Sequence, residues 1–127
     1  MINSQFISEH WVGLWLTGLG SVVILSLVPG FSPPSQYSLD KLMHFGAHFC
    51  LAAVPLFCFV RREAAFLAVG LIPALGFALE YAQKGIAGRE FSPEDMLANN
   101  LGALAGILVG LALRMNKRFQ RQTGQKP

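Results

Sequence analysis

Four long stretches of this chain contain no lysine, arginine, aspartate or glutamate, and they constrain the fold more than any other feature. These stretches cover residues 11–28, 42–60, 64–79 and 96–113. A helix that crosses a membrane needs ~20 mostly apolar residues. The last three stretches reach that length once the polar residues at their ends are included. We therefore predict transmembrane helices over residues 11–28, 40–60, 64–83 and 94–113.

The composition argues against a water-soluble helical bundle. Hydrophobic residues make up 53% of the chain and charged residues only 13%, whereas soluble domains have ~25% charged residues. Each helix of a soluble bundle also needs a charged outer face, which these stretches lack. The sequence thus predicts an all-α fold: an integral membrane four-helix bundle that forms a single domain over residues 1–127. Residues 114–127 would form a basic tail.

The distribution of basic residues predicts the orientation in the membrane. Seven of the ten lysines and arginines lie between the second and third helices or after the fourth. The other three are Lys41, Lys84 and Arg89. Because basic residues are enriched on the cytoplasmic side of membrane proteins, we expect both termini to be cytoplasmic. The loops before Asp40 and after Gln83 would then face outward.

Polar residues begin the second helix on one side. Asp40, His44 and His48 fall within one quadrant of a helix, with Lys41 at its edge, because a helix turns about 100° per residue. Ionisable groups in membrane-length segments are costly and therefore indicate function. A first-turn carboxylate also stabilises a helix N-terminus without any chemical role, so Asp40 alone would decide nothing.

The third helix ends, and the fourth begins, with further polar residues. Glu80 and Gln83 close the third helix, whereas Asp95 and Asn99 share a face of the fourth with Gly102, Gly106 and Gly110. Such a glycine ridge allows close helix packing, which would turn Asp95 and Asn99 inward. We therefore expect one outward-opening polar pocket. Its residues would be Asp40, Lys41, His44, Glu80, Gln83, Arg89, Asp95 and Asn99.

These residue types suit two kinds of chemistry. Polar or basic side chains that suit a phosphate or carboxylate are the candidate ligand-binding residues: Lys41, Gln83, Arg89 and Asn99. An isolated arginine such as Arg89 would also suit lipid phosphates at the interface. Side chains capable of acid–base catalysis are the candidate catalytic residues: Asp40, His44, Glu80 and Asp95. The sequence predicts no metal site and identifies no cofactor. If a metal were bound, His44 and His48 would be the candidate ligands, together with an acid from another helix.

Three motifs occur in order at the outer helix ends. They are Asp40-Lys41-x-x-His44-Phe45, Glu80-x-x-Gln83 and Arg89-x-x-Ser92-x-x-Asp95-x-x-x-Asn99-x-x-Gly102. Through these motifs the chain resembles the VanZ-like membrane proteins over residues 11–113, except at His48, where an aromatic residue is expected. The resemblance implies a multi-pass protein of the bacterial cytoplasmic membrane, linked to the cell envelope and to glycopeptide resistance, chiefly to teicoplanin. It implies no mechanism.

Three functions from different classes follow from these residues. The first is a binding protein whose pocket holds an anionic envelope lipid or a peptidoglycan precursor. The alternative is a membrane-embedded enzyme, an acid–base or metal-assisted hydrolase or transferase that acts on a lipid-linked envelope precursor. The third is proton-coupled transport, for which one small chain would need to form a homo-oligomer. Nucleic acid is not an expected partner, because anionic lipids already account for the basic tail.

Overall fold

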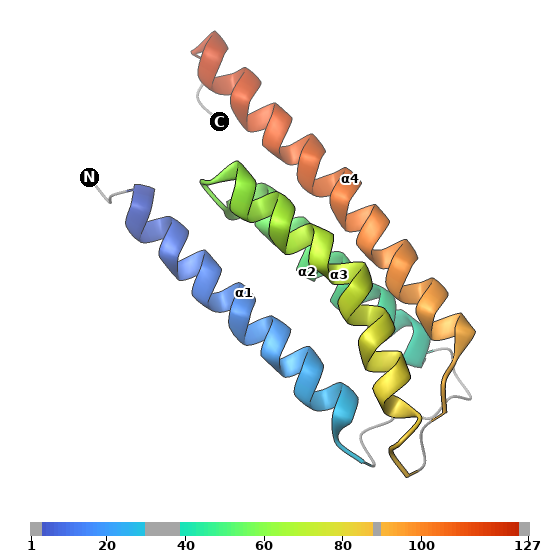
Figure 1. The fold of residues 1–127 in the computed structure, drawn as a ribbon. Coiled ribbons are helices and arrows are strands. Elements are labelled where there is room, and N and C mark those ends of the chain that lie inside the picture. Colours follow the sequence, from blue (N-terminus) through green and yellow to red (C-terminus); the bar gives the residue numbers. More distant parts are fainter. Residues whose placement is uncertain (1–3, 30–38, 88–89, 125–127) are drawn as a thin grey trace.

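A computed structural model describes residues 4–29, 39–87 and 90–124. The described residues form four helices and no strand (Figure 1). The helices are α1 (Ser4–Leu27), α2 (Leu39–Cys58), α3 (Arg62–Gln83) and α4 (Pro93–Thr123). Each contains a segment that is long and apolar enough to cross a membrane. The predicted all-α membrane fold with four helices is therefore confirmed.

Two helices extend beyond the apolar stretches that predicted them. α1 begins at Ser4 rather than at residue 11, and α4 continues to Thr123 rather than ending at 113. Neither extension contains a proline or glycine that would stop a helix. α4 ends where Gly124 adopts a left-handed conformation, with φ of 69°. Most of the basic tail is therefore a continuation of α4, because hydropathy marks the membrane boundary and not the helix end.

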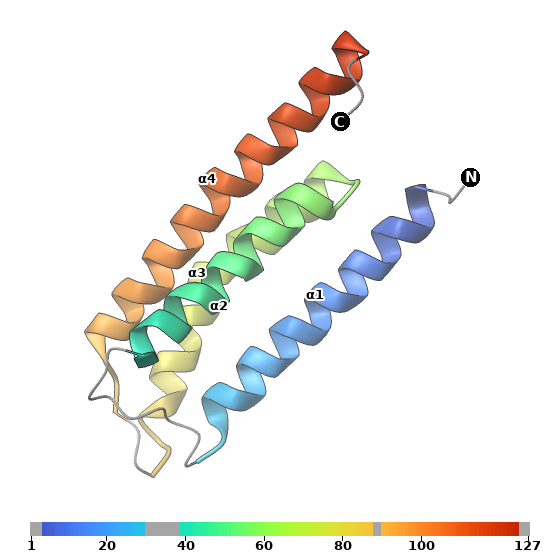
Figure 2. The same ribbon diagram turned by 180° about the vertical axis from the view of Figure 1, so that it is seen from behind.

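The helices follow one another up and down, and α2 and α3 lie between α1 and α4 in both views (Figures 1 and 2). α2 and α4 pack closely through the glycine ridge predicted from the sequence. A Cβ atom added at Gly102 or Gly106 would collide with the backbone oxygen of Phe45 or Phe49. At Gly110 it would lie 2.9 Å from the backbone oxygen of Ala53. Because glycine has only a hydrogen as its side chain at these positions, the backbones of α2 and α4 can approach closely.

α1 lies on the outside of the bundle. None of the residues in its membrane-length window is buried, as expected of a helix whose other faces meet lipid. One attachment of α1 is Trp15, whose indole Nε1 donates a hydrogen bond to the Leu51 backbone oxygen at 2.8 Å. The Trp15 ring also packs edge-on against Phe59. Tryptophan favours the headgroup region of a bilayer, but these two contacts of Trp15 join α1 to α2 and to Phe59 directly after it.

The bundle therefore has two chemically different ends. The start of α2, the end of α3 and the start of α4 meet at one end, which brings together the polar segments singled out in the sequence. The α2–α3 turn, the start of α1 and the basic end of α4 lie at the other (Figure 1).

Candidate functional site

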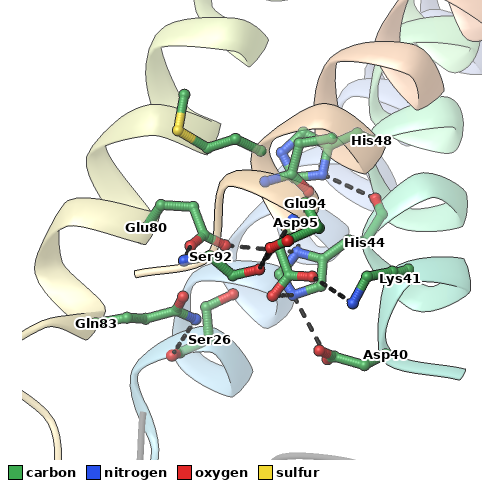
Figure 3. Close-up of polar contacts among 12 residues, drawn as sticks. Ser26, Asp40, Lys41, His44, His48, Glu80, Gln83, Ser92, Glu94 and Asp95 are labelled. Carbon is green, nitrogen blue, oxygen red and sulfur yellow. Dashed lines mark hydrogen bonds and ion pairs between the residues drawn. The ribbon is translucent and has the colours of Figure 1, made fainter. Parts of the chain in front are cut away.

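His44 lies at the centre of a group of polar side chains from α2, α3 and α4 (Figure 3). Its Nδ1 atom lies 3.0 Å from the Asn99 side-chain oxygen. Its Nε2 atom lies 3.7 Å from an Asp40 carboxylate oxygen and 3.8 Å from one of Asp95. We call Asp40, Lys41, His44, Glu80, Asp95 and Asn99 the polar cluster.

The hydrogen bond to Asn99 restricts the chemistry of the His44 ring. An amide oxygen only accepts hydrogen bonds, so Nδ1 must carry the hydrogen. Nε2 then faces Asp40 and Asp95 in one of two forms. If the ring is protonated, Nε2 carries a second N–H that pairs with the two carboxylates. If the ring is neutral, Nε2 has a lone pair that could bind a cation together with those carboxylates.

Glu80 is the most deeply buried acid of the polar cluster. Its side chain comes from the last turns of α3, and the residue is only 1% exposed. One carboxylate oxygen accepts a hydrogen bond from the Ser92 backbone N–H at 3.2 Å. The other lies 4.0 Å from His44 Nδ1 and has no hydrogen-bond donor within the described part of the chain. Because burying an unpaired carboxylate is costly, His44 is the available basic partner of Glu80.

Asp95 is positioned by the start of α4. Ser92 caps this helix, and its hydroxyl oxygen accepts a hydrogen bond from the Asp95 backbone N–H at 3.2 Å. Pro93 follows in the first turn, where the missing N–H costs nothing. The carboxylate of Asp95 lies 3.7 Å from Nζ of Lys41. Since the Lys41 side chain is 45% exposed, it places a positive charge at the edge of the cluster.

Two of the residues singled out in the sequence lie elsewhere in the described structure, and a third lies outside it. Gln83 donates a hydrogen bond to the Ser26 backbone oxygen at 3.0 Å and so ties α3 to α1. His48 is 3% exposed, and its Nδ1 lies 3.0 Å from the His44 backbone oxygen. Its Nε2 faces Gly76, where an added Cβ would lie 3.0 Å away. Arg89 falls outside the described residues.

Three side chains of the polar cluster form a set that could hold a metal ion. One ligand atom from each of Asp40, His44 and Asp95 lies within 4.8 Å of the others. Two carboxylate oxygens and one imidazole nitrogen are ligands that suit a divalent metal ion. His48 is not among these residues, so the set differs from the histidine pair that the sequence suggested.

The polar cluster holds more acidic than basic side chains. Asp40, Glu80 and Asp95 supply three carboxylates, whereas Lys41 is the one lysine or arginine among the cluster residues. Buried oxygens of both Glu80 and Asp95 lack a hydrogen-bond donor among the residues that the structure describes. The cluster can therefore receive a group that carries N–H or O–H donors or a positive charge, while Lys41 can meet an anion.

Two serines contribute backbone contacts that were not predicted. The Ser92 hydroxyl caps α4, and the Ser92 backbone N–H also donates a hydrogen bond to Glu80. The backbone oxygen of Ser26 accepts a hydrogen bond from the Gln83 side chain. These contacts use backbone atoms, which every residue has, so no pattern of side chains in the sequence could predict them.

A comparison with models of known protein families identifies the family of this chain. The family model described as VanZ/LLP1 matches residues 3–114, which include the first three membrane-length segments, most of the fourth and the whole polar cluster. The comparisons with curated proteins and with solved structures give no match. The resemblance seen in the sequence motifs is thereby confirmed: the chain is a multi-pass membrane protein that belongs to the VanZ/LLP1 family.

Proposed function

We propose that this protein of the cell envelope uses its polar cluster to bind the headgroup of an anionic envelope lipid or of a peptidoglycan precursor. The observation that carries this proposal is the meeting of ionisable side chains from three helices around His44. Ionisable groups are kept in membrane-length segments only at a cost, and function is the usual reason. A binding role accounts for their position at one end of the bundle, where lipid headgroups lie.

Each part of the cluster has a role in such binding. Lys41, half exposed at the edge, would attract the phosphate of the headgroup, and Arg89 is the second proposed source of positive charge. The inner carboxylates of Glu80 and Asp95 would accept hydrogen bonds from N–H or O–H groups of the same ligand. A headgroup that carries both phosphate and hydrogen-bond donors therefore matches the cluster better than a simple anion.

The same proposal requires the cluster to face outward. The asymmetry of the basic residues supports a membrane orientation with both termini in the cytoplasm. We expect single cysteines at Ser35 and Gly88, both outside the described residues, to react with a membrane-impermeant thiol reagent on intact cells. Labelling only after the cells are opened would place the cluster on the cytoplasmic side and contradict the proposal.

The binding role predicts a specific effect of Lys41→Gln. Removing the positive charge should weaken binding of anionic headgroups by about fivefold, since a basic residue near a membrane surface contributes about 1 kcal/mol. The matched control is Lys84→Gln, which removes the same charge from an exposed lysine that packs over the Tyr81 and Phe91 rings. Titration of both variants with phosphatidylglycerol in nanodiscs measures the effect. Equal weakening in the two variants would show that only the net charge of the surface matters.

One observation favours a second function, the metal-assisted or acid–base enzyme. Asp40, His44 and Asp95 could hold a divalent ion, which would polarise a phosphoryl oxygen or activate a water molecule. In that role the three residues would bind the ion, and Glu80 would be the nearby acid or base.

Metal analysis separates the two functions. The metal-assisted enzyme requires purified protein to retain about one equivalent of a divalent metal, and Asp40→Asn to lose it. It also requires release of a soluble product from a lipid-linked precursor. Protein that binds headgroups equally well with and without a chelator would support the binding role alone.

A further inference from the structure

A second candidate binding region lies at the opposite end of the bundle from the polar cluster. The structure contains a cavity of about 360 Å³ there, between the start of α1, the end of α2 and the basic end of α4. Its lining includes three aromatic and four basic side chains: Trp11, Phe57, Phe59, Arg114, Lys117, Arg118 and Arg121. We call this region the basic cavity.

The basic cavity combines positive charge with an absence of acidic side chains from its described lining. Arg114 is committed to the protein itself, since its guanidinium donates to the backbone oxygens of Leu56 at 2.8 Å and Phe59 at 3.2 Å. It thereby satisfies carbonyl groups at the end of α2. Lys117 lies over the Phe57 ring, 3.4 Å from its centre. Arg118 and Arg121 are exposed, and they do not bind the carbonyl groups at the end of α2 as Arg114 does.

The remaining lining is apolar, and two features of this end of the bundle suit a membrane interface. Trp11 is 40% exposed, and tryptophan prefers the headgroup region of a bilayer. α4 is about 46 Å long at 1.5 Å per residue, which exceeds the hydrocarbon thickness of about 30 Å. Its basic end therefore projects past the α2–α3 turn, as Figure 2 shows. Positive charge here lies beside apolar surface, an arrangement that suits an amphiphile better than a soluble anion.

We propose that the basic cavity binds the phosphate headgroup of an anionic phospholipid, distinct from the ligand of the polar cluster. Arg118 and Arg121 would contact the phosphate, with Lys117 beside it, and the acyl chains would run along the apolar surfaces next to Trp11. The bound lipid would join the start of α1 to the end of α4. Among the described residues these two helices make no direct backbone contact.

The test compares two double variants of the full chain that remove equal charge from the same end of the bundle. R118Q/R121Q removes charge from the basic cavity, whereas R61Q/R62Q removes it from exposed arginines outside the lining. Both are made in the Lys41→Gln background, which weakens binding at the polar cluster. Because the two double variants share this background, a difference between them reports the basic cavity. Native mass spectrometry then measures binding of phosphatidylglycerol, of phosphatidylcholine and of glycerol 3-phosphate.

We expect phosphatidylglycerol to bind more tightly than phosphatidylcholine, and R118Q/R121Q to weaken it about tenfold more than R61Q/R62Q. Circular dichroism should show unchanged helix content, because glutamine is a good helix former. Equal weakening in both double variants would mean unspecific surface attraction and would overturn the proposal. Competition by glycerol 3-phosphate at the same concentration as the lipid would also overturn it, since the site would then bind a soluble phosphate ester.

Discussion

Replacing Gly106 by leucine is expected to disrupt the bundle although it changes no ionisable group. Even the first carbon of the new side chain would collide with the Phe49 backbone oxygen and come within 3.1 Å of the Ala52 methyl group. The backbones of α2 and α4 would have to separate along their main contact. Overpacking of this kind costs about 1–3 kcal/mol where side chains can yield, and more where backbone must move. We therefore expect about 3 kcal/mol or more.

The matched control is Gly70→Leu in α3. Gly70 is exposed, and a Cβ added there meets no atom within 4 Å. The two variants add the same side chain to a membrane-length helix, so any difference between them reports the helix contact. Thermal unfolding in detergent, followed by circular dichroism and by size-exclusion chromatography, measures it. Equal unfolding midpoints for the two variants would show that the glycine ridge faces lipid instead of α2.

Uncharged apolar length was enough to predict the number of helices, because crossing a bilayer demands it. It could not predict where the helices end, since Ser4 and Thr123 lie beyond the apolar stretches. Nor could it identify helix partners. The spacing of Gly102 and Gly106 predicts that something packs closely against α4. That this partner is α2 follows only from the contacts with Phe45 and Phe49.

The periodicity of α2 predicted that Asp40 and His44 share a side, and they do lie 3.7 Å apart. The same periodicity placed His48 on that side, one turn deeper than His44. It could not predict that α3 covers His48 there, with Gly76 against the ring. Periodicity gives the direction of a side chain from its own helix, whereas its neighbours depend on how the other helices pack. For that reason, the pairing of Lys41 with Asp95 was also beyond the reach of the sequence.

Charge, more than shape, distinguishes the two ends of this bundle. Around His44, three carboxylates outnumber Lys41, and hydrogen-bond donors for buried oxygens of Glu80 and Asp95 are lacking among the described residues. Around Arg118 the opposite holds, because the described lining of the basic cavity contains no acid. If the polar cluster acts on a ligand, the negative charge of its carboxylates should contribute to that function. Neutral residues of the same shape test this directly.

Glu80→Gln and Asp95→Asn are accordingly expected to abolish the function of the polar cluster while leaving the fold intact. Glutamine at position 80 keeps an oxygen that can accept from the Ser92 backbone N–H. Asparagine at position 95 keeps the backbone N–H that binds the Ser92 hydroxyl. Each change removes one negative charge close to His44. Headgroup binding should fall at least about tenfold, or about 1.4 kcal/mol.

The control for both variants is Glu94→Gln, the same chemical change in an exposed residue next to Asp95. We expect it to retain binding, because Glu94 contacts Ser92 outside the polar cluster. Unfolding midpoints in detergent must be measured for all three variants alongside binding. If Glu80→Gln and Asp95→Asn both unfold, the acids serve the bundle rather than a ligand. If both fold and bind as the unaltered chain does, the polar cluster is not the binding site, and the proposed function fails.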